Sequence, residues 1–464
     1  MKVHYNSTVR NIRKIIKGKK IKGKEDLIID TITTDSRQLG SNNLFIPIVG
    51  EKFDGHDFIK ELSEGSKVNC FLSMKDGYEN FAGDDIALIR CDDTLKAYGM
   101  IAQKHREEVN PRVVGITGTN GKTTTKELVF SILKEKHSTL RNEKNYNNEI
   151  GVPFTLLGLN EGHEVAVIEM GMNHAGELDR LSRMSRPDIS LITNIGEGHI
   201  EFFDTVENVA RAKSEILNGM SRGSVVLINR DTESFDLLLE KSKSLGLSVK
   251  TFGINDNADI YPREYHLSAN GIELFYGGEK IWAPLYGIHN VYNLLGAIAV
   301  ALEFNIELET INKSLSTFEN VSGRSQVIDR GFIVVNDTYN SNPLSSKYAL
   351  SSVREIFPER RKIAVLSDMK ELGEKWESYH FETGKLVGEY GFHMLCAWGE
   401  MSKTYIEGAK KTGMDSENLL YFESKVKMID FLKSKVNRDD VILVKGSRSM
   451  KMEEVVNSLI TGGE

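Results

Sequence analysis

A short apolar run that passes directly into a glycine-rich turn is the feature that most restricts how this chain can fold. Residues 113–125 read Val-Val-Gly-Ile-Thr-Gly-Thr-Asn-Gly-Lys-Thr-Thr-Thr, and Leu128, Ile132 and Leu133 follow on one face of an expected helix. In a strand–turn–helix unit of this kind, backbone N–H groups of the turn face a bound phosphate, and the helix N-terminus adds its partial positive charge. The pattern predicts a nucleotide-binding α/β unit.

The turn departs from the usual phosphate-loop spacing, which places a further glycine about five residues before the Gly-Lys pair. Ile116 stands there, and Gly118 opens a shorter Gly-x-x-Gly-Lys-Thr-Thr form. Lys122 still falls where it reaches the outer phosphates, and the Thr123 hydroxyl falls where it completes the coordination of Mg²⁺. We interpret the segment as an ATP site; the alternative is a plain strand-to-helix turn.

Apolar runs alternate with helical stretches along most of the chain, which is typical of parallel, doubly wound sheets. Runs of this kind lie at 113–117, 165–169, 189–193 and 225–229, and a second set lies at 332–336, 363–367, 393–398 and 441–445. Residues 319–323 form a turn-rich joint between the two sets. The first 95 residues instead mix short β-like runs, at 27–32 and 44–49, with turn-rich segments.

These patterns predict an α/β protein of three domains. The expected domains are a small mixed α/β domain over 1–95, a central P-loop ATPase-like parallel sheet over 96–320 and a Rossmann-like α/β domain over 321–464.

Composition limits the classes of function. The net charge is −7, so a nucleic-acid binder is disfavoured, and we interpret the basic stretch over 10–24 as a solvated surface. The sequence contains no apolar run long enough for a membrane span, and its beginning lacks a signal-peptide pattern. Cys70, Cys91 and Cys396 lie far apart, which fits a reducing compartment and predicts a cytoplasmic protein.

Two further polar side chains follow strands of the expected central sheet. Glu169 ends the run Val-Ala-Val-Ile, and His199 follows the run over 189–193 through a short loop. Ligands of open α/β sheets bind outside the carboxyl ends of the strands. A carboxylate and an imidazole that converge there on a nucleotide suit a divalent ion. Taken singly, each also fits a surface or loop residue.

A lysine also interrupts an apolar helix face. Residues 206–217 form an expected amphipathic helix, and Lys213 lies seven residues after Val206, within the apolar stripe. A buried, unpaired ammonium is costly, so such a lysine loses its charge or finds a partner. A neutral amine reacts with CO₂ to give an anionic carbamate, which is an oxygen donor for a metal. The alternative is a lysine whose ammonium extends out to solvent.

Together these residues resemble the Mur ligases, ATP-dependent amide-bond-forming enzymes of bacterial cell-wall synthesis. The matching segments cover all three expected domains. They are residues 34–37, 54–56, 118–127, 145–153, 169–173, 194–199, 212–215, 289–293, 323–324, 337–343, 368–373 and 444–448. The sequence departs from the family pattern at two positions, Ser367 in place of a usual glycine and Lys370 in place of a usual apolar residue. Both concern contacts with the acceptor, the substrate whose amine forms the new amide bond.

The resemblance implies a role for individual residues. ATP would be held by Gly118, Thr119, Asn120, Gly121, Lys122, Thr123 and Thr124, with Asn290, Asn293, Arg324 and Asp337. Two Mg²⁺ ions would be held by Thr123, Glu169, His199 and a carbamylated Lys213, and Lys122, His199 and Lys213 would be the catalytic residues. A UDP-sugar would be bound by Ser36, Arg37, Asp54, Gly55 and His56. Without the resemblance, Asn290 and Asn293 also fit a helix cap and a surface amide, and Arg324 an interdomain salt bridge.

The resemblance also implies the reaction. The run Tyr-Asn-Ser-Asn-Pro at 339–343 favours the member of the family that joins D-alanyl-D-alanine to UDP-N-acetylmuramoyl-tripeptide through an acyl phosphate, with release of ADP and phosphate. We expect a monomer that binds these two substrates and no nucleic acid, with the acceptor bound by the third domain, between it and the central domain. The alternatives are a Mur-type ligase for another amino acid, a folate polyglutamate-forming relative, and a regulatory ATPase that does not ligate.

Overall fold

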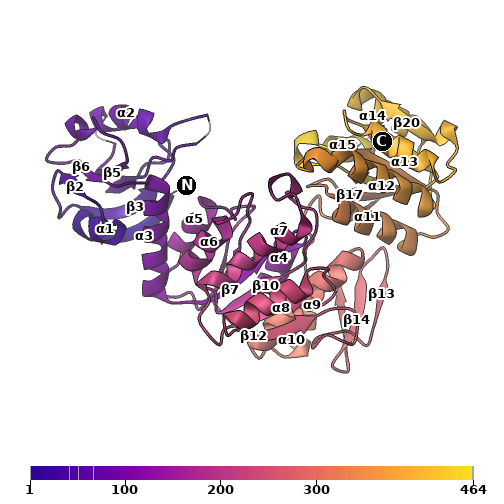
Figure 1. The fold of residues 1–464 in the computed structure, drawn as a ribbon, viewed down its shortest axis with the longest axis horizontal. Coiled ribbons are helices and arrows are strands. Elements are labelled where there is room, and N and C mark those ends of the chain that lie inside the picture. Colours follow the sequence, from indigo (N-terminus) through magenta and orange to yellow (C-terminus); the bar gives the residue numbers. More distant parts are fainter. Residues whose placement is uncertain (1, 41, 51, 66, 462–464) are drawn as a thin grey trace.

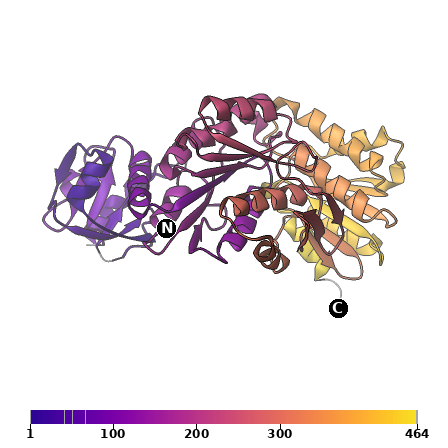
Figure 2. The ribbon, with the colours of Figure 1, turned by 90° about the horizontal axis from the view of Figure 1, so that it is seen from below.

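The computed structural model describes residues 2–40, 42–50, 52–65 and 67–461. Three α/β parts follow one another along the long axis of the molecule, from the indigo N-terminal end to the yellow C-terminal end (Figures 1 and 2). We call them the N-terminal part (β1 to β6), the central part (α3 to α10) and the C-terminal part (β16 to α15). The predicted three-part α/β class is confirmed. The segments of the chain that the structure describes include no helix that is long and apolar enough to cross a bilayer.

The central part is built on a parallel sheet in the order β12-β11-β10-β7-β9-β8. Its strands are β7 (Arg112–Thr117), β8 (Thr139–Arg141), β9 (Val165–Glu169), β10 (Ile189–Ile192), β11 (Val225–Asn229) and β12 (Ser248–Phe252). β7 lies between β9 and β10. The next two strands along the chain, β8 and β9, lie on one side of β7, and β10, β11 and β12 lie on the other. The carboxyl ends of β7, β9 and β10 therefore meet at the switch point where such sheets bind ligands.

Helices cover both faces of this sheet, which is why its strands are almost continuously apolar. They are α3 (Thr94–Val109), α4 (Lys122–Leu133), α5 (Gly151–Leu157), α6 (Glu177–Ser185), α7 (Val206–Lys213), α8 (Phe235–Ser244), α9 (Ile288–Glu303) and α10 (Leu308–Ser316). Val114 and Ile116 pack into the core with α4 and α9, whereas Val113 packs into the core on the other face. That second core continues through α3 into the N-terminal part.

The sequence pattern missed one element of the central part. An antiparallel sheet of β13 (Glu264–Leu267), β14 (Ile272–Tyr276) and β15 (Glu279–Ala283) follows β12 where the pattern weakened. Its buried residues alternate along β14 (Ile272 and Leu274) and β15 (Ile281 and Ala283), whereas β13 has no buried residue. Such short, half-exposed strands carry too few apolar residues to be distinguished from loop by periodicity.

The N-terminal part is a mixed sheet in the order β1-β3-β4-β5-β6-β2. Its strands are β1 (Lys2–Thr8), β2 (Lys20–Lys22), β3 (Ile28–Thr33), β4 (Asn43–Phe45), β5 (Cys70–Ser73) and β6 (Ala87–Arg90), with helices α1 (Val9–Ile16) and α2 (Ile59–Glu64). β3 to β6 are parallel to one another, and β1 and β2 pair antiparallel at the two edges.

The C-terminal part is a sheet in the order β16-β17-β21-β18-β19-β20, parallel except for β16. Its strands are β16 (Gln326–Asp329), β17 (Ile333–Asp337), β18 (Lys362–Ser367), β19 (Met394–Trp398), β20 (Leu419–Phe422) and β21 (Val441–Lys445). Its helices are α11 (Pro343–Ile356), α12 (Trp376–Glu389), α13 (Lys403–Lys410), α14 (Lys425–Lys435) and α15 (Glu453–Ile460).

Several expected bounds were wrong by a few residues. The run expected over 44–49 forms a strand only to Phe45, because Pro47 cannot donate a ladder hydrogen bond. The helix expected over 206–217 is α-helical only to Lys213 and continues as a 3₁₀ helix, Ser214–Gly219.

Candidate active site

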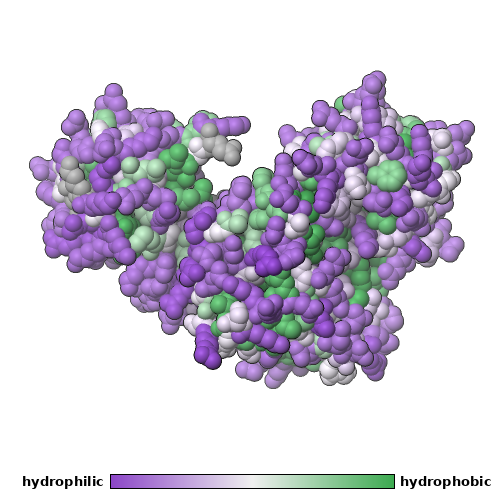
Figure 3. Space-filling model, in the orientation of Figure 1, coloured by the Kyte–Doolittle hydropathy of each residue, from purple (hydrophilic) through white to green (hydrophobic). Residues whose placement is uncertain are grey.

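A polar cavity lies between the central and the C-terminal parts, at the carboxyl ends of β7, β9 and β10. Its walls come from the glycine-rich loop, from segments that follow β9 and β10, from the residues just before β16, from the start of α11 and from the loop after β18. In the space-filling view, an open notch separates the N-terminal and the C-terminal parts above the central part (Figure 3). Most of the residues predicted to bind ATP and metal line this cavity; Gly118, Lys213 and Asn290 are not among its lining residues.

The loop between β7 and α4 has the conformation that a phosphate loop needs. Gly121 has a φ of +82° at the N-cap position of α4, and a Cβ there would lie 2.2 Å from Asn293 Oδ1. Only glycine meets both conditions. The backbone of Asn120 is held by the end of the β10 segment, because its N–H donates to Asn194 Oδ1 (2.9 Å) and its carbonyl accepts from Thr193 Oγ1 (2.6 Å).

Lys122 points back over this loop. Its ammonium donates to the carbonyl oxygens of Gly118 (2.8 Å) and Thr119 (3.0 Å). Burial lowers the pKa of Lys122 to about 8; the nearby Glu169 carboxylate raises it and the Arg324 guanidinium lowers it. The cation is therefore placed at the mouth of the loop, beside the helix N-terminus that attracts phosphate.

Glu169 is buried at the end of β9, with 1% of its surface exposed. Asn147 Nδ2 donates to its Oε1 (2.7 Å), and Lys126 Nζ lies 3.9 Å from its Oε2. That Oε2 accepts no hydrogen bond from any described residue. Asn142 fixes the backbone, since it donates to the Glu169 carbonyl (2.8 Å) and accepts from the Glu169 N–H (2.9 Å). A buried carboxylate oxygen that accepts no hydrogen bond beside a cavity fits a divalent ion.

His199 belongs to the central part but faces the C-terminal part. Its Nδ1 lies 2.7 Å from Glu371 Oε2, and the Glu201 N–H donates to the Glu371 carbonyl (3.1 Å). The interaction with His199 lowers the pKa of the Glu371 carboxyl, against the opposing effect of burial. His199 has a φ of +59°, in the left-handed region that a non-glycine residue rarely adopts. The structure thus brings His199 to the cavity at a contact between the two parts.

Lys213 is the last residue of α7 and has 1% of its surface exposed. Burial lowers its pKa well below the ordinary lysine value, and the cation of Lys122 lowers it further. Among the described residues, no anionic group offsets these two effects. The alternative of an ammonium that extends to solvent is therefore wrong, and a neutral amine, which the carbamate hypothesis requires, is favoured.

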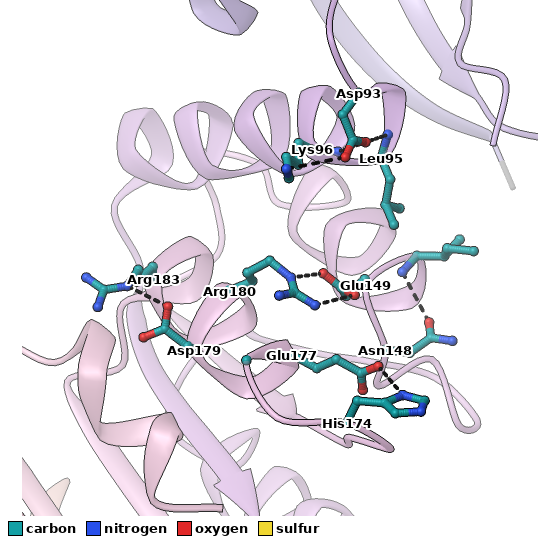
Figure 4. Close-up of polar contacts among 12 residues, drawn as sticks. Asp93, Leu95, Lys96, Asn148, Glu149, His174, Glu177, Asp179, Arg180 and Arg183 are labelled. Atoms are coloured by element: carbon teal, nitrogen blue, oxygen red, sulfur yellow. Dashed lines mark hydrogen bonds and ion pairs between the residues drawn. The ribbon is translucent and has the colours of Figure 1, made fainter. Parts of the chain in front are cut away.

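The segment after β9 is held against the cavity by the start of α6. The Asn173 N–H donates to Glu177 Oε2 (2.8 Å), and His174 Nδ1 lies 3.3 Å from Glu177 Oε1 (Figure 4). Glu215, two residues after Lys213, accepts from the Gly176 N–H (2.9 and 2.8 Å). These contacts fix the loop whose residues Met172 and Asn173 line the cavity.

The two predicted adenine-contacting amides are close together but differ in exposure to the cavity. Asn293 Nδ2 donates to Asn290 Oδ1 (2.7 Å), and Asn290 Nδ2 donates to the Tyr286 carbonyl (2.8 Å). Asn293 lines the cavity, whereas Asn290 is buried behind it. Asn290 therefore orients Asn293 in this structure, and a direct adenine contact by Asn290 stays a prediction.

Arg324 and Asp337 reach the cavity from the C-terminal part, as expected. Arg324 Nη2 donates to Thr123 Oγ1 (3.0 Å), and its guanidinium lies 3.9 Å from the centroid of the Tyr339 ring. Asp337 Oδ2 forms an ion pair with Lys445 Nζ (2.5 Å). Burial alone would raise the pKa of Asp337, but the Lys445 ammonium outweighs it, so the pKa lies below its ordinary value.

We expect Asp337→Asn to destabilise the C-terminal part by about 3 kcal/mol at pH 7, because Lys445 has 2% of its surface exposed and loses its counter-ion. Since the folded pKa of Asp337 is depressed, the ion pair's contribution is complete above the ordinary aspartate pKa of 3.8 and is lost as the pH falls through the folded value. The difference between the variants should shrink in acid. Urea unfolding followed by the fluorescence of Trp376 and Trp398 measures it, and equal midpoints at pH 7 would contradict the prediction. Asp256→Asn, at an exposed carboxylate, is the control.

The residues predicted to bind a UDP-sugar separate into two groups. Ser36 and Arg37 line a second cavity, in the N-terminal part, whose other walls include Phe58 and Lys67. Arg37 forms a bidentate ion pair with Asp35, with both N···O distances 2.9 Å. This cavity stands apart from the first.

Asp54, Gly55 and His56 form a turn in which only His56 is fully buried, and they do not line either cavity. Asp54 Oδ1 accepts from the His56 N–H (2.9 Å) and lies 2.7 Å from His56 Nδ1. Because His56 Nε2 accepts from the Met74 N–H (3.3 Å), the proton sits on Nδ1 and is donated to Asp54. A Cβ on Gly55 would lie 2.7 Å from the Ile48 nitrogen, so the turn admits only glycine. The contacts of these residues are structural, and their part in sugar binding stays a prediction.

Some residues in the cavity or directly behind it received no role from the sequence. Asn142 and Asn147 orient Glu169, Glu371 faces His199, and Lys445 pairs with Asp337. Lys445 is the last residue of β21 and Glu371 follows β18, so the rule of strand carboxyl ends could have found both. Asn147 had no such signal, because the strand before it, β8, was not among the runs predicted from the sequence.

The donor set for a metal is mixed. Across the described ranges, no three His, Cys, Asp or Glu side chains come together as a ready metal site. Thr123, Glu169 and His199 nevertheless line one cavity, and Glu169 Oε2, which accepts no hydrogen bond from any described residue, fits a divalent ion. Such oxygen-rich, water-completed sites suit Mg²⁺ bound together with a nucleotide phosphate.

A phosphate loop on a parallel sheet, completed by cations from a second α/β part, defines a nucleotide-dependent enzyme whose site forms between two domains. Family models match most of the chain: residues 28–115 match the Mur ligase family, catalytic domain, residues 116–301 the Mur ligase middle domain, and residues 323–448 the Mur ligase, glutamate ligase domain. The chain belongs to the Mur ligase family.

Known relatives match this chain over nearly its whole length. The chain is 35% identical to the UDP-N-acetylmuramoyl-tripeptide--D-alanyl-D-alanine ligase of Bacillus subtilis, with 98% of each chain covered. A crystal structure of MurF from Acinetobacter baumannii superposes with a TM-score of 0.87 at 28% identity and covers 99% of each chain. A MurF ligase from Thermotoga maritima in complex with ADP has the same fold, with a TM-score of 0.82 at 24% identity and coverage of 93% and 97%.

Proposed function

We propose that this chain joins D-alanyl-D-alanine to UDP-N-acetylmuramoyl-tripeptide, with conversion of ATP to ADP and phosphate, in the synthesis of peptidoglycan precursors. The observation that carries the proposal is the cavity between the central and C-terminal parts, where Lys122, Glu169 and His199 meet Arg324 and Asp337. The relative from Bacillus subtilis, which is named for this activity, matches this chain over 98% of its length.

ATP binding is supported by the geometry of the loop and by the ADP complex of the Thermotoga relative. The phosphates would lie over residues 118–124, with Lys122 at their outer end. Thr123, Glu169, His199 and a carbamylated Lys213 would hold Mg²⁺, which supplies positive charge to the phosphates when it is bound. Asn293, Arg324 and Asp337 would complete the nucleotide site, with Asn290 behind Asn293.

The reaction has two steps. A carboxylate oxygen of the tripeptide attacks the γ-phosphorus of ATP, the bond from that phosphorus to ADP breaks, and an acyl phosphate forms. The amine of the dipeptide then attacks the acyl carbon, the carbon–oxygen bond to phosphate breaks, and the amine loses a proton. Because anionic reactants must meet, neutralisation of charge by Lys122 and Arg324 is the main demand on the site.

Each of the three parts would bind a different substrate. We propose boundaries at 1–95, 96–320 and 321–464, with the UDP-sugar on the first domain, ATP on the second and the acceptor on the third. Ser36 and Arg37 would bind the sugar nucleotide at the second cavity, with Asp54, Gly55 and His56 shaping the neighbouring turn. The tripeptide would cross the notch between the outer parts toward Glu169 and His199. A monomer in the cytoplasm, with its supply of ATP, would suffice for this chemistry.

The test incubates purified protein with ATP, Mg²⁺ and UDP-muramoyl-tripeptide, together with single amino acids or dipeptides. We expect phosphate release that depends on both the nucleotide peptide and D-alanyl-D-alanine, with the ligated product seen by mass spectrometry. Release with a single amino acid would identify another Mur-type ligase. Release without either substrate would identify an ATPase that does not ligate.

A further inference from the structure

The phosphate loop and the C-terminal part are joined by two amide side chains that exchange hydrogen bonds. Asn120 Nδ2 donates to Asn342 Oδ1 (3.2 Å), and Asn342 Nδ2 donates to Asn120 Oδ1 (2.8 Å). Asn120 lies between Gly118 and Gly121 in the loop, and Asn342 is the N-cap residue of α11. Both line the cavity between the two parts.

The orientation of Asn342 follows from the helix that it caps. Its Oδ1 accepts from the Ser345 N–H (2.8 Å), and its own N–H donates to Ser345 Oγ (3.0 Å), so a full capping box fixes the side chain. With Oδ1 committed to the helix, Nδ2 must point away from the helix. An acceptor, Asn120 Oδ1, stands at that place.

Asn120 has the complementary arrangement. Its N–H and carbonyl are engaged by Asn194 and Thr193, which belong to the central part. Its side chain is therefore free to serve the contact with Asn342. The loop conformation and the docked position of the C-terminal part are thus connected through one pair of side chains.

We infer that Asn342 is a positioning residue that couples docking of the C-terminal domain to the nucleotide-binding form of the phosphate loop. When the C-terminal domain docks, the amide exchange holds Asn120 in place and brings Arg324 and Asp337 to the same cavity. Nucleotide affinity and domain docking then favour each other, because each stabilises the same arrangement. The inference rests on the proposed function only for its effect on ligation; the effect on nucleotide affinity stands separately.

A double-mutant cycle on the affinity for Mg²⁺-ADP, measured by titration calorimetry, tests this coupling. Asn342→Ser keeps a good N-cap but is too short to reach Asn120, and Asn120→Ala removes the other amide. Each single variant is expected to weaken ADP binding about ten-fold, the scale of one to two net hydrogen bonds. The double variant is expected to be no weaker than the weaker single variant. Losses that multiply in the double variant would overturn the inference.

The matched control lies on the same helix and the same interface. Ser352 Oγ accepts from the Ile288 N–H (3.2 Å), a contact between the two parts at the far end of α11 from the loop. Asn120→Ala and Ser352→Ala should combine by simple multiplication of their effects, because Ser352 does not touch the loop. If this second cycle shows the same coupling as the first, the effect belongs to the whole interface and the specific role of Asn342 is lost.

A second variant separates loss of the Asn120–Asn342 contact from misfolding. Asn342→Asp keeps a strong N-cap but turns a carboxylate oxygen toward Asn120 Oδ1, so the same loss of ADP affinity is expected while the melting temperature stays near wild type. Asn342→Ala loses the cap as well and should melt lower. ADP affinity at the wild-type level in the aspartate variant would contradict the inference.

The ligation reaction provides a measurement that would stay unchanged if Asn342 only stabilised the fold. A poorly docked domain admits water to the acyl phosphate, so Asn342→Ser should release more phosphate per amide bond formed than the wild type. Ser352→Ala should keep the wild-type ratio. If the wild type itself forms no amide bond, the proposed function fails, whereas the ADP cycle still decides the coupling.

Discussion

Lys122→Ala is expected to abolish ATP-dependent ligation, with a loss in turnover of at least ~100-fold, while the fold stays intact. Removal of one preorganised charge or donor from a site of developing negative charge has effects of this size. The ammonium of Lys122 lies on the Gly118 and Thr119 carbonyls, so it stands at the mouth of the phosphate loop. Alanine suits the first turn of α4, which is why the helix should persist.

The same lysine predicts a dependence on pH. Burial lowers the pKa of Lys122 to about 8 in the free protein, so the cation is lost as the pH rises through that value. The affinity of the free protein for ATP should therefore fall between neutral pH and pH 9, and this slope should vanish in Lys122→Ala. Lys134→Ala, at the exposed C-terminal end of the same helix, removes an equal charge as the control. Near-normal turnover in Lys122→Ala would refute the assignment of the loop.

Lys213→Ala is expected to be inactive and to regain part of its activity when a short-chain carboxylate such as acetate is added. Burial lowers the pKa of Lys213 well below the usual lysine value, which favours the neutral amine. A neutral amine adds to the carbon of CO₂, forms a nitrogen–carbon bond and loses a proton, which leaves an anionic carbamate. An external carboxylate in the space left by alanine restores oxygen donors of the same charge.

Two controls separate this hypothesis from a packing effect. Lys213→Arg keeps a cation that cannot form a carbamate, and it should be inactive without rescue. Lys126 is also buried but is paired with Glu127 (2.9 Å), so loss of activity in Lys126→Ala should not respond to acetate. Activity that is untouched in Lys213→Ala would remove the carbamate from the proposal. A ¹³C carbamate signal after incubation with labelled bicarbonate, absent in the alanine variant, provides a direct observation.

The predicted residues that the structure brings to or near the cavity follow from short-range sequence patterns. The loop between β7 and α4 combines an apolar strand, glycines and a helix start within thirteen positions, residues 113–125, so its local conformation follows from local sequence. Glu169 and His199 followed from the rule that strand ends meet at one edge of a parallel sheet. The periodicity of 206–217 placed Lys213 on a buried face, which the structure confirms.

Local sequence pattern was enough to predict the class of the fold, the phosphate loop and the residues at the carboxyl ends of the strands, because each depends on residues close together in the chain. The partners that these residues contact lie more than a hundred positions away, and they became known from the packing of the three parts. It pairs His199 with Glu371, Asp337 with Lys445 and Asn120 with Asn342. The spacing of apolar residues indicates which face of a strand or helix is buried, but it does not indicate how two separate sheets dock. The contacts that complete the site therefore exist only once the domains have packed.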